Sequence, residues 1–70
     1  MRFNYSKLRG LIKEKFETQE KFAKAMGMDM STLSARLNNK TYFTSDEMFK
    51  ACNLLGVPKV QIPFFFFFLD

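Results

Sequence analysis

The chain has 70 residues, with 11 Lys and Arg against 7 Asp and Glu, a net charge of +4, one cysteine and no histidine. This length allows one domain with a modest core, and the single Cys52 excludes an intramolecular disulfide. There is no glycine-rich phosphate loop and no evident base beside Ser34 or Cys52, so we expect neither an enzyme nor a bound cofactor or metal. Seven of the basic residues lie in the first 24 positions, which suits a polyanionic partner.

The sequence carries no targeting or membrane-spanning signal. Its first residues are too polar to begin a signal peptide, and no apolar run reaches the length of a membrane span. A free cysteine also suits a reducing compartment. We therefore expect a cytoplasmic protein with no membrane partner and no small-molecule substrate.

The first predicted helix covers residues 5–16 and follows Asn4, whose side chain can cap the free N–H groups of the first turn. Within it, Leu8, Ile12 and Phe16 recur every four residues and predict one buried face.

Two short helices are predicted next, at residues 19–26 and 30–38. Thr18 and Asp29 stand at their N-cap positions, and Gly27 lies where the end of a helix requires a positive φ.

The clearest helix start is a capping box, in which Thr44 is followed three residues later by Glu47. It predicts a fourth helix over residues 45–55. A brief fifth helix is expected at residues 58–61, ended by Pro63.

The Phe-rich tail, residues 64–70, follows no helical or alternating pattern. Its five consecutive aromatic residues are Phe64, Phe65, Phe66, Phe67 and Phe68. Three interpretations stay open: a strand or hydrophobic arm that forms a dimer, a segment that packs back on its own core, or a frayed end. We therefore divide the chain into a helical domain at residues 1–63, which contains the motif described next, and a tail at 64–70 that we regard as a dimerisation arm in the first of these interpretations.

The second and third helices have the residues that a helix-turn-helix requires. Ala23 is small where the helices cross, Gly27 allows a tight turn, and Met28 and Leu33 are apolar to lock the crossing. In this arrangement the second helix of the motif projects its N-terminal residues into the DNA major groove. The alternative is a plain helical hairpin in a small bundle.

Two segments, TQEKFAKAMG at residues 18–27 and STLSARLNNK at residues 31–40, resemble the Cro/cI-type (XRE-like) helix-turn-helix family of phage and prophage transcriptional regulators. The resemblance covers residues 4–62. It implies an all-α, five-helix fold like the lambda repressor DNA-binding domain, in the cytoplasm of a bacterial host. It also implies a homodimer that binds a pseudo-palindromic operator in double-stranded DNA and controls transcription, usually as a repressor. The chain departs from the family at Glu17, where a small residue often precedes the motif, and in the Phe-rich tail.

The resemblance also implies roles for individual residues. The base-facing residues are Met30, Ser31, Ser34 and Ala35, and the phosphate-contacting residues are Thr18, Gln19, Thr32, Asn38, Lys40 and Thr41. None of the four base-facing side chains can make a bidentate contact to guanine or adenine. Met30 is either base-facing or part of the core, and for Arg36 we expect a phosphate or structural role.

Two other functions are considered. The first is a protein-interaction module that keeps the helix-turn-helix scaffold and acts through the Phe-rich tail, which the polar-poor face of the third helix favours. The second is an RNA-binding protein, which only the net charge supports, because the helical region has no aromatic platform for stacking unpaired bases.

Overall fold

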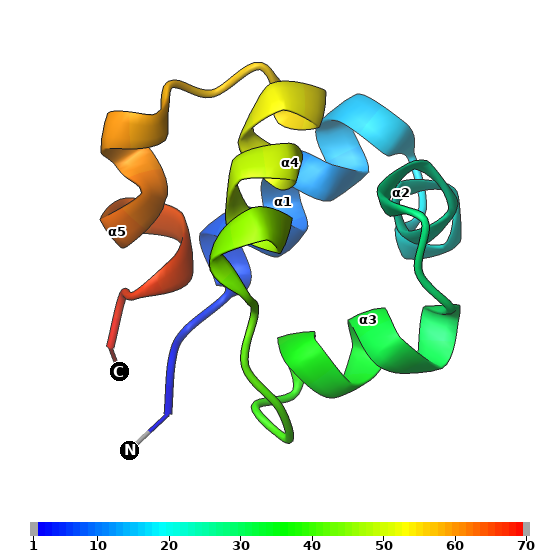
Figure 1. Ribbon diagram of the computed structural model, residues 1–70, viewed down its shortest axis with the longest axis horizontal. Helices are drawn as coiled ribbons and strands as arrows, with labels where there is room; N and C mark the ends of the chain where they lie inside the picture. The colour runs from blue at the N-terminus through cyan, green and yellow to red at the C-terminus, as the bar shows by residue number, and fades with distance from the viewer. Residues whose placement is uncertain (1, 70) are drawn as a thin grey trace.

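The computed structural model describes residues 2–69, which fold into a small all-helical domain (Figure 1). Its elements are α1 (Ser6–Phe16), α2 (Gln19–Met26), α3 (Met30–Leu37), α4 (Ser45–Leu55), the 3₁₀ turn η1 (Lys59–Gln61) and α5 (Ile62–Phe66). The expected all-α, five-helix fold is therefore confirmed. Every helix within residues 2–69 is too short or too polar to cross a lipid bilayer.

The helices are arranged around α1 and α4, which lie at the centre of the domain (Figure 1). Helix α2 packs against α1, α3 and α4, while α5 packs against α1 and α4 on the opposite side. The two ends of the described chain meet beside α5. Phe3 and Leu69 form an isolated antiparallel bridge, and the Asn4 N–H donates to the Phe68 carbonyl at 2.6 Å.

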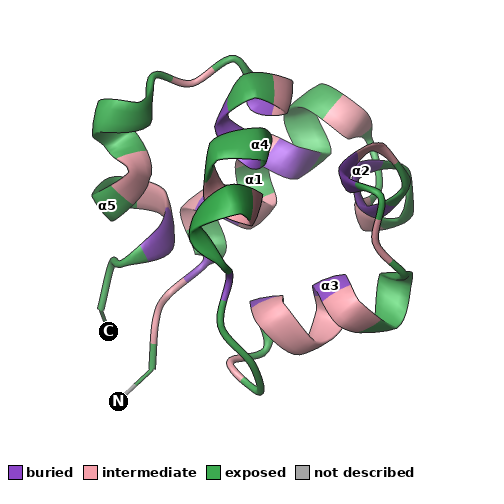
Figure 2. Cartoon of the chain, in the orientation of Figure 1, coloured by how far each residue is buried: buried purple, intermediate pink, exposed green. Residues whose placement is uncertain are grey.

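The buried residues lie between these helices (Figure 2), and within residues 2–69 all of them are hydrophobic. Its members are Tyr5, Leu8, Ile12, Phe22, Ala23, Met26, Leu33, Leu37, Phe43, Ala51, Cys52, Leu55 and Phe66. Cys52 is the one thiol of the chain and is only 2% exposed. Its burial raises the pKa of that thiol, so Cys52 is a core side chain in the protonated form.

Local capping signals set most helix ends as predicted. The Thr18 side chain accepts from the Lys21 N–H, and Gly27 ends α2 at a φ of 75°. The capping box of α4 is complete, because Thr44 Oγ1 accepts from the Glu47 N–H and Glu47 Oε1 accepts from the Thr44 N–H.

Two helix ends and one capping hydrogen bond differ from the prediction. Helix α1 begins one residue late, with Tyr5 at the N-cap, and Asn4 Oδ1 accepts from the Ser6 N–H. Asp29 is the N-cap of α3, but its side chain accepts no capping hydrogen bond. Helix α3 ends at Leu37 rather than at residue 38.

The prediction for the segment after α4 was right about a brief helix near residues 58–61 and wrong about Pro63. Residues 59–61 form a 3₁₀ turn, and Pro63 lies in the first turn of α5 rather than ending a helix. A proline is well tolerated there, since the first N–H groups of a helix have no intrahelical partner.

The Phe-rich tail packs back on the core, as one of the three interpretations expected. Helix α5 crosses the expected boundary at residue 63, and Phe66 is 2% exposed and meets Phe43 edge-on with ring centroids 5.1 Å apart. Within residues 2–69 the tail forms no strand beyond the single bridge to Phe3. Phe64, at 49% exposed, and Phe68, at 40%, lie on the outer side of the tail.

The core position of Phe66 leads to a stability prediction. Phe66→Ala should lower the free energy of unfolding by about 3–5 kcal/mol, the cost typical of removing a buried phenylalanine. The matched variant Phe64→Ala, at a half-exposed position of the same helix, should cost less than about 1.5 kcal/mol. Urea unfolding followed by circular dichroism measures both values, and equal losses would mean that Phe66 is not a core residue in solution.

Candidate nucleic-acid interface

Helices α2 and α3 are joined by the three-residue turn Gly27–Asp29, and their crossing uses the expected scaffold residues. Ala23 and Leu33 are buried between the helices, and Met28 is half-buried against the core. The Met28 N–H donates to the Ala23 carbonyl at 3.0 Å, which closes the turn. Lys50 on α4 donates through Nζ to the Met26 carbonyl at 3.1 Å and so satisfies the end of α2.

The four expected base-facing residues lie outside the buried core, whereas Leu33 and Leu37 are the buried residues of α3. Met30 is 37% exposed and Ser31 is exposed, whereas Ser34 and Ala35 are half-buried. Met30 therefore does not belong to the buried core. The surface that these residues form is small and uncharged.

The C-terminal end of α3 is held by side chains, including one that we expected at a phosphate. Asn38 donates through Nδ2 to the Ser34 carbonyl at 2.9 Å and to Ser34 Oγ at 3.1 Å. Arg9 on α1 donates through Nη2 to the Leu37 carbonyl at 3.0 Å and to Asn38 Oδ1 at 3.3 Å. The Asn38 side chain is thus engaged within the protein.

Arg36 has the structural role that was one of its two expected roles. Its Nε and Nη2 donate to Oε1 and Oε2 of Glu47 at 2.9 and 3.1 Å, which makes a bidentate ion pair between α3 and α4. Its Nη1 donates to Thr41 Oγ1 at 2.7 Å, so this hydroxyl, expected at a phosphate, is also engaged. The hydrogen bond from Arg36 lowers the pKa of Glu47 below its ordinary value. The pair fixes the position of α3 relative to α4.

This ion pair makes the stability of the domain depend on pH. Since the pKa of Glu47 is lower in the folded protein than in the unfolded chain, its contribution is present above the ordinary carboxyl pKa and is lost as the pH falls toward the lowered value. Glu47→Gln keeps a capping-box side chain but removes the charge. It should cost about 1–2 kcal/mol at pH 7, and this cost should shrink as the pH falls below the ordinary carboxyl pKa.

Chemical unfolding of both proteins between pH 2.5 and pH 7 measures the difference. Glu17→Gln is the control, because the ion pair of Glu17 with Lys21 is exposed to solvent. A constant gap between wild type and Glu47→Gln across this pH range would contradict the role given to the ion pair.

The other expected phosphate contacts lie at the ends of α2 and α3. Thr18 is the N-cap of α2, and Gln19 is half-buried in the first turn of the same helix. Thr32 is half-buried in the first turn of α3, and Lys40 is exposed just beyond the end of α3.

The charges beside these residues are mixed. Lys21 is paired with Glu17 at 2.7 Å, while Lys24 is exposed. A shallow groove between α2 and the start of α3 also carries two acidic residues, Glu20 and Asp29, in its lining. The positive charge near α3 is therefore modest.

Asn39 is a structural residue that the sequence did not reveal. It adopts a φ of 64°, and its side chain pairs with the backbone of Phe3. The Phe3 N–H donates to Asn39 Oδ1, and Asn39 Nδ2 donates to the Phe3 carbonyl, both at 2.9 Å. The amide thus ties the N-terminal segment to the end of α3. The paired asparagines in the sequence indicate only a helix end and give no sign of this contact.

Glu17, where the sequence departs from the related family, occupies a strained turn between α1 and α2. Its φ is 73° and its ψ is −44°, and the Thr18 N–H donates to the Phe16 carbonyl across it at 2.8 Å, which makes a γ-turn. A residue with a Cβ is unfavourable at a positive φ, whereas glycine adopts it freely.

Relief of this strain is measurable. Glu17→Gly should raise the melting temperature by roughly 4–8 °C, although it removes the exposed ion pair with Lys21. Glu17→Ala removes the same ion pair and keeps the strained Cβ, so it should not raise the melting temperature. The difference in melting temperature between the two variants, measured by calorimetry, reports the backbone strain at position 17. Equal melting temperatures would show that Glu17 is unstrained in solution.

The chain is similar to a protein family and to a solved structure. A family model described as "Protein of unknown function (DUF739)" matches residues 1–68. The solution structure of the modulator of repression (MOR) of the temperate bacteriophage TP901-1 from Lactococcus lactis has 43% sequence identity and a TM-score of 0.84 to this chain. The match covers 96% of this chain and 90% of that chain. No curated protein sequence matches the chain.

Proposed function

The chain belongs to the DUF739 family, and we propose that it is a phage regulatory protein that modulates repression by binding double-stranded DNA. The observation that carries the proposal is the exposed face of α3, presented by a tight turn from α2 in the geometry that inserts a helix into the major groove. The name of the similar phage protein supports a role in repression. In this proposal the chain acts in the bacterial cytoplasm as a Cro/cI-type homodimer, without catalysis or cofactor.

Base contacts in this proposal are few and individually weak. Met30 and Ala35 meet thymine methyl groups, while Ser31 and Ser34 each make a single hydrogen bond to a base edge. Ser34 Oγ already accepts from Asn38 and keeps its own proton for donation. A bidentate contact is worth about 1–3 kcal/mol of discrimination, and these four side chains cannot make one. Sequence preference then depends on methyl contacts and on DNA shape.

Affinity in this proposal comes from phosphates and from the pairing of two subunits. Thr18 and Gln19 present the N-terminus of α2, where free N–H groups and the helix dipole favour an anion. Lys40 supplies an exposed cation beyond the other end of the motif. The ion pair of Arg36 with Glu47 and the hydrogen bonds from Arg9 hold α3 in place before DNA arrives, which lowers the entropy cost of docking.

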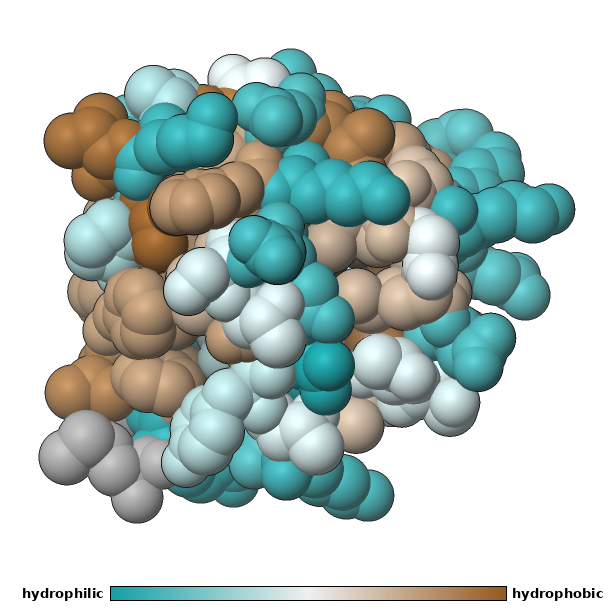
Figure 3. Space-filling view, in the orientation of Figure 1, coloured by the Kyte–Doolittle hydropathy of each residue, from teal (hydrophilic) through white to brown (hydrophobic). Residues whose placement is uncertain are grey.

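A second candidate function is supported by the Phe-rich tail. Hydrophobic side chains gather over α5, on the left of Figure 3, and hydrophilic ones over α2 on the right. Phe64, Phe67, Phe68 and Leu69 are all at least 40% exposed. A contiguous apolar patch of this kind is typical of a protein-binding surface. A modulator that acts on a protein partner through this patch is therefore the alternative.

The DNA proposal is tested by salt-dependent binding. Pseudo-palindromic duplexes selected from a randomised pool are titrated at several salt concentrations, and log affinity should fall linearly with log salt by about 0.9 for each neutralised phosphate. Lys40→Ala should lower the slope by about one in each subunit, and the double variant Gln19→Ala with Lys40→Ala should weaken binding further. Lys59→Ala removes the same charge on η1, at the opposite end of the domain, and should leave the slope unchanged.

The outcomes separate the two candidates. Equal effects of Lys40→Ala and Lys59→Ala would mean that DNA is not bound through α3. Selection of no duplex at all would favour the protein-interaction candidate. Phe68→Ser tests the dimer in the same titration, because loss of binding together with a monomeric sedimentation profile would assign the dimer contact to the tail.

A further inference from the structure

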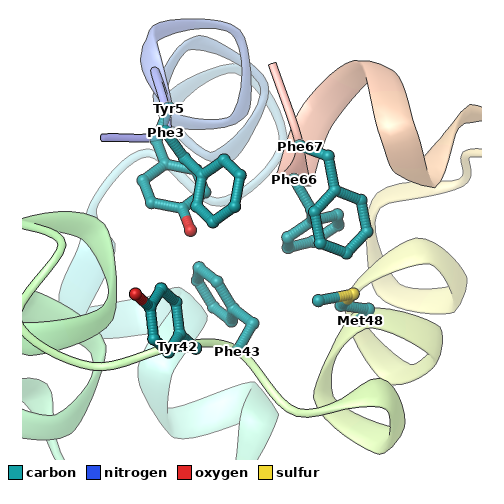
Figure 4. A pocket seen from close by; sticks show the side chains of 7 residues that line it. All are labelled: Phe3, Tyr5, Tyr42, Phe43, Met48, Phe66 and Phe67. Carbon is teal, nitrogen blue, oxygen red and sulfur yellow. The ribbon is translucent and has the colours of Figure 1, made fainter. Parts of the chain in front are cut away.

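An aromatic pocket lies at the end of the domain where the N-terminal segment, the loop after α3 and helices α4 and α5 meet (Figure 4). Its volume is about 290 Å³, and its lining is Phe3, Tyr5, Tyr42, Phe43, Met48, Phe66 and Phe67. The pocket is partly open to solvent, and its lining consists of six aromatic rings and one methionine. None of the lining residues belongs to the proposed DNA surface.

The walls of the pocket are fixed before any ligand arrives. Phe43 packs edge-on against Tyr5 and Phe66, with ring centroids 5.5 and 5.1 Å apart, and all three rings are buried. Phe3 packs edge-on against Phe67 at 5.6 Å and against Tyr42 at 6.2 Å. Because these rings hold one another, the pocket does not need to be formed by the ligand.

Two hydroxyl groups give the pocket a polar side. The hydroxyl oxygens of Tyr5 and Tyr42 lie on the same side of the space, facing each other (Figure 4). Burial and the neighbouring Tyr42 raise the pKa of Tyr5, so its hydroxyl stays protonated at neutral pH and is able to donate. Tyr42 is mostly exposed and stands at the opening.

We propose that this pocket is a binding site for a small planar molecule, one aromatic ring that carries a hydroxyl or another hydrogen-bonding group. The lining matches this class, since small-molecule sites are mostly apolar and aromatic with a few placed polar groups. The volume matches it too: an apolar cavity of about 150 Å³ holds benzene, and 290 Å³ accommodates a substituted ring.

The site goes beyond the proposed function and does not rest on it. Tyr42 and Phe43 belong to the segment between α3 and α4, where Thr41 is held by Arg36. A ligand in the pocket therefore contacts the chain directly after α3. This places an effector site next to the element that carries the proposed DNA face, while the two sites share no residue.

The test is a titration of the ¹⁵N-labelled protein with 4-ethylphenol, followed by amide shifts. Saturable shifts should be confined to the residues around Phe3, Tyr42, Met48 and Phe67. Ethylbenzene, which lacks the hydroxyl, should bind about 3–10-fold more weakly, the range that one neutral hydrogen bond provides. Tyr42→Phe removes one hydroxyl at an exposed position and should reduce this ratio.

A variant that fills the pocket completes the test. Met48→Phe places a larger ring in the space and should abolish the shifts without lowering the melting temperature. If Met48→Phe fails to fold, the ratio of the affinities for 4-ethylphenol and ethylbenzene, compared between wild type and Tyr42→Phe, tests the proposal by itself. Shifts that stay linear up to the solubility limit, or that persist in a folded Met48→Phe protein, would overturn the proposal. So would tighter binding of N-acetyl-tyrosine amide than of 4-ethylphenol, because the site would then suit a side chain of a protein partner.

Discussion

The edge-to-face contacts of Phe43 with Tyr5 and Phe66 hold together three segments that are distant in the sequence. Tyr5 directly precedes α1, Phe43 lies between α3 and α4, and Phe66 ends α5. A 70-residue chain with one cysteine and no histidine lacks the disulfide or zinc site that often stabilises a domain of this size. These aromatic contacts, together with the terminal bridge between Phe3 and Leu69, take that role. The tail is thus a structural part of the domain, whether or not it also binds a partner.

The charged side chains near α3 serve the structure more than recognition. Arg36 is committed to Glu47 and Thr41, and Arg9 is committed to the end of the same helix. Consequently, the helix that a helix-turn-helix protein uses for reading is rigidly placed but carries no free cation on its outer face. Under the DNA-binding proposal, α3 itself adds little long-range attraction to DNA, and the association rate depends on charges elsewhere in the molecule.

The parts of the fold that follow from the sequence are those with local causes. Thr18 and Gly27 delimit α2, and the Thr44 capping box starts α4, because each signal acts within one turn of the chain. The Phe-rich tail was not predictable in the same way, since an unbroken run of one residue shows no period and helix formation there depends on packing against α1 and α4. The Arg36–Glu47 and Asn39–Phe3 contacts join residues 11 and 36 positions apart, which no short-range pattern reports.

The burial of Cys52 makes its reaction with an alkylating reagent a measure of how the domain opens. A thiol that is 2% exposed and protonated does not react with an alkylating reagent while the domain is closed. The rate at which Cys52 is alkylated therefore depends on how often α4 separates from the rest of the core. With no second cysteine in the chain, one added mass per molecule records one such event. When reclosing is faster than alkylation, the modification rate gives the population of the open domain, free or bound to any partner, from the native sequence without a label.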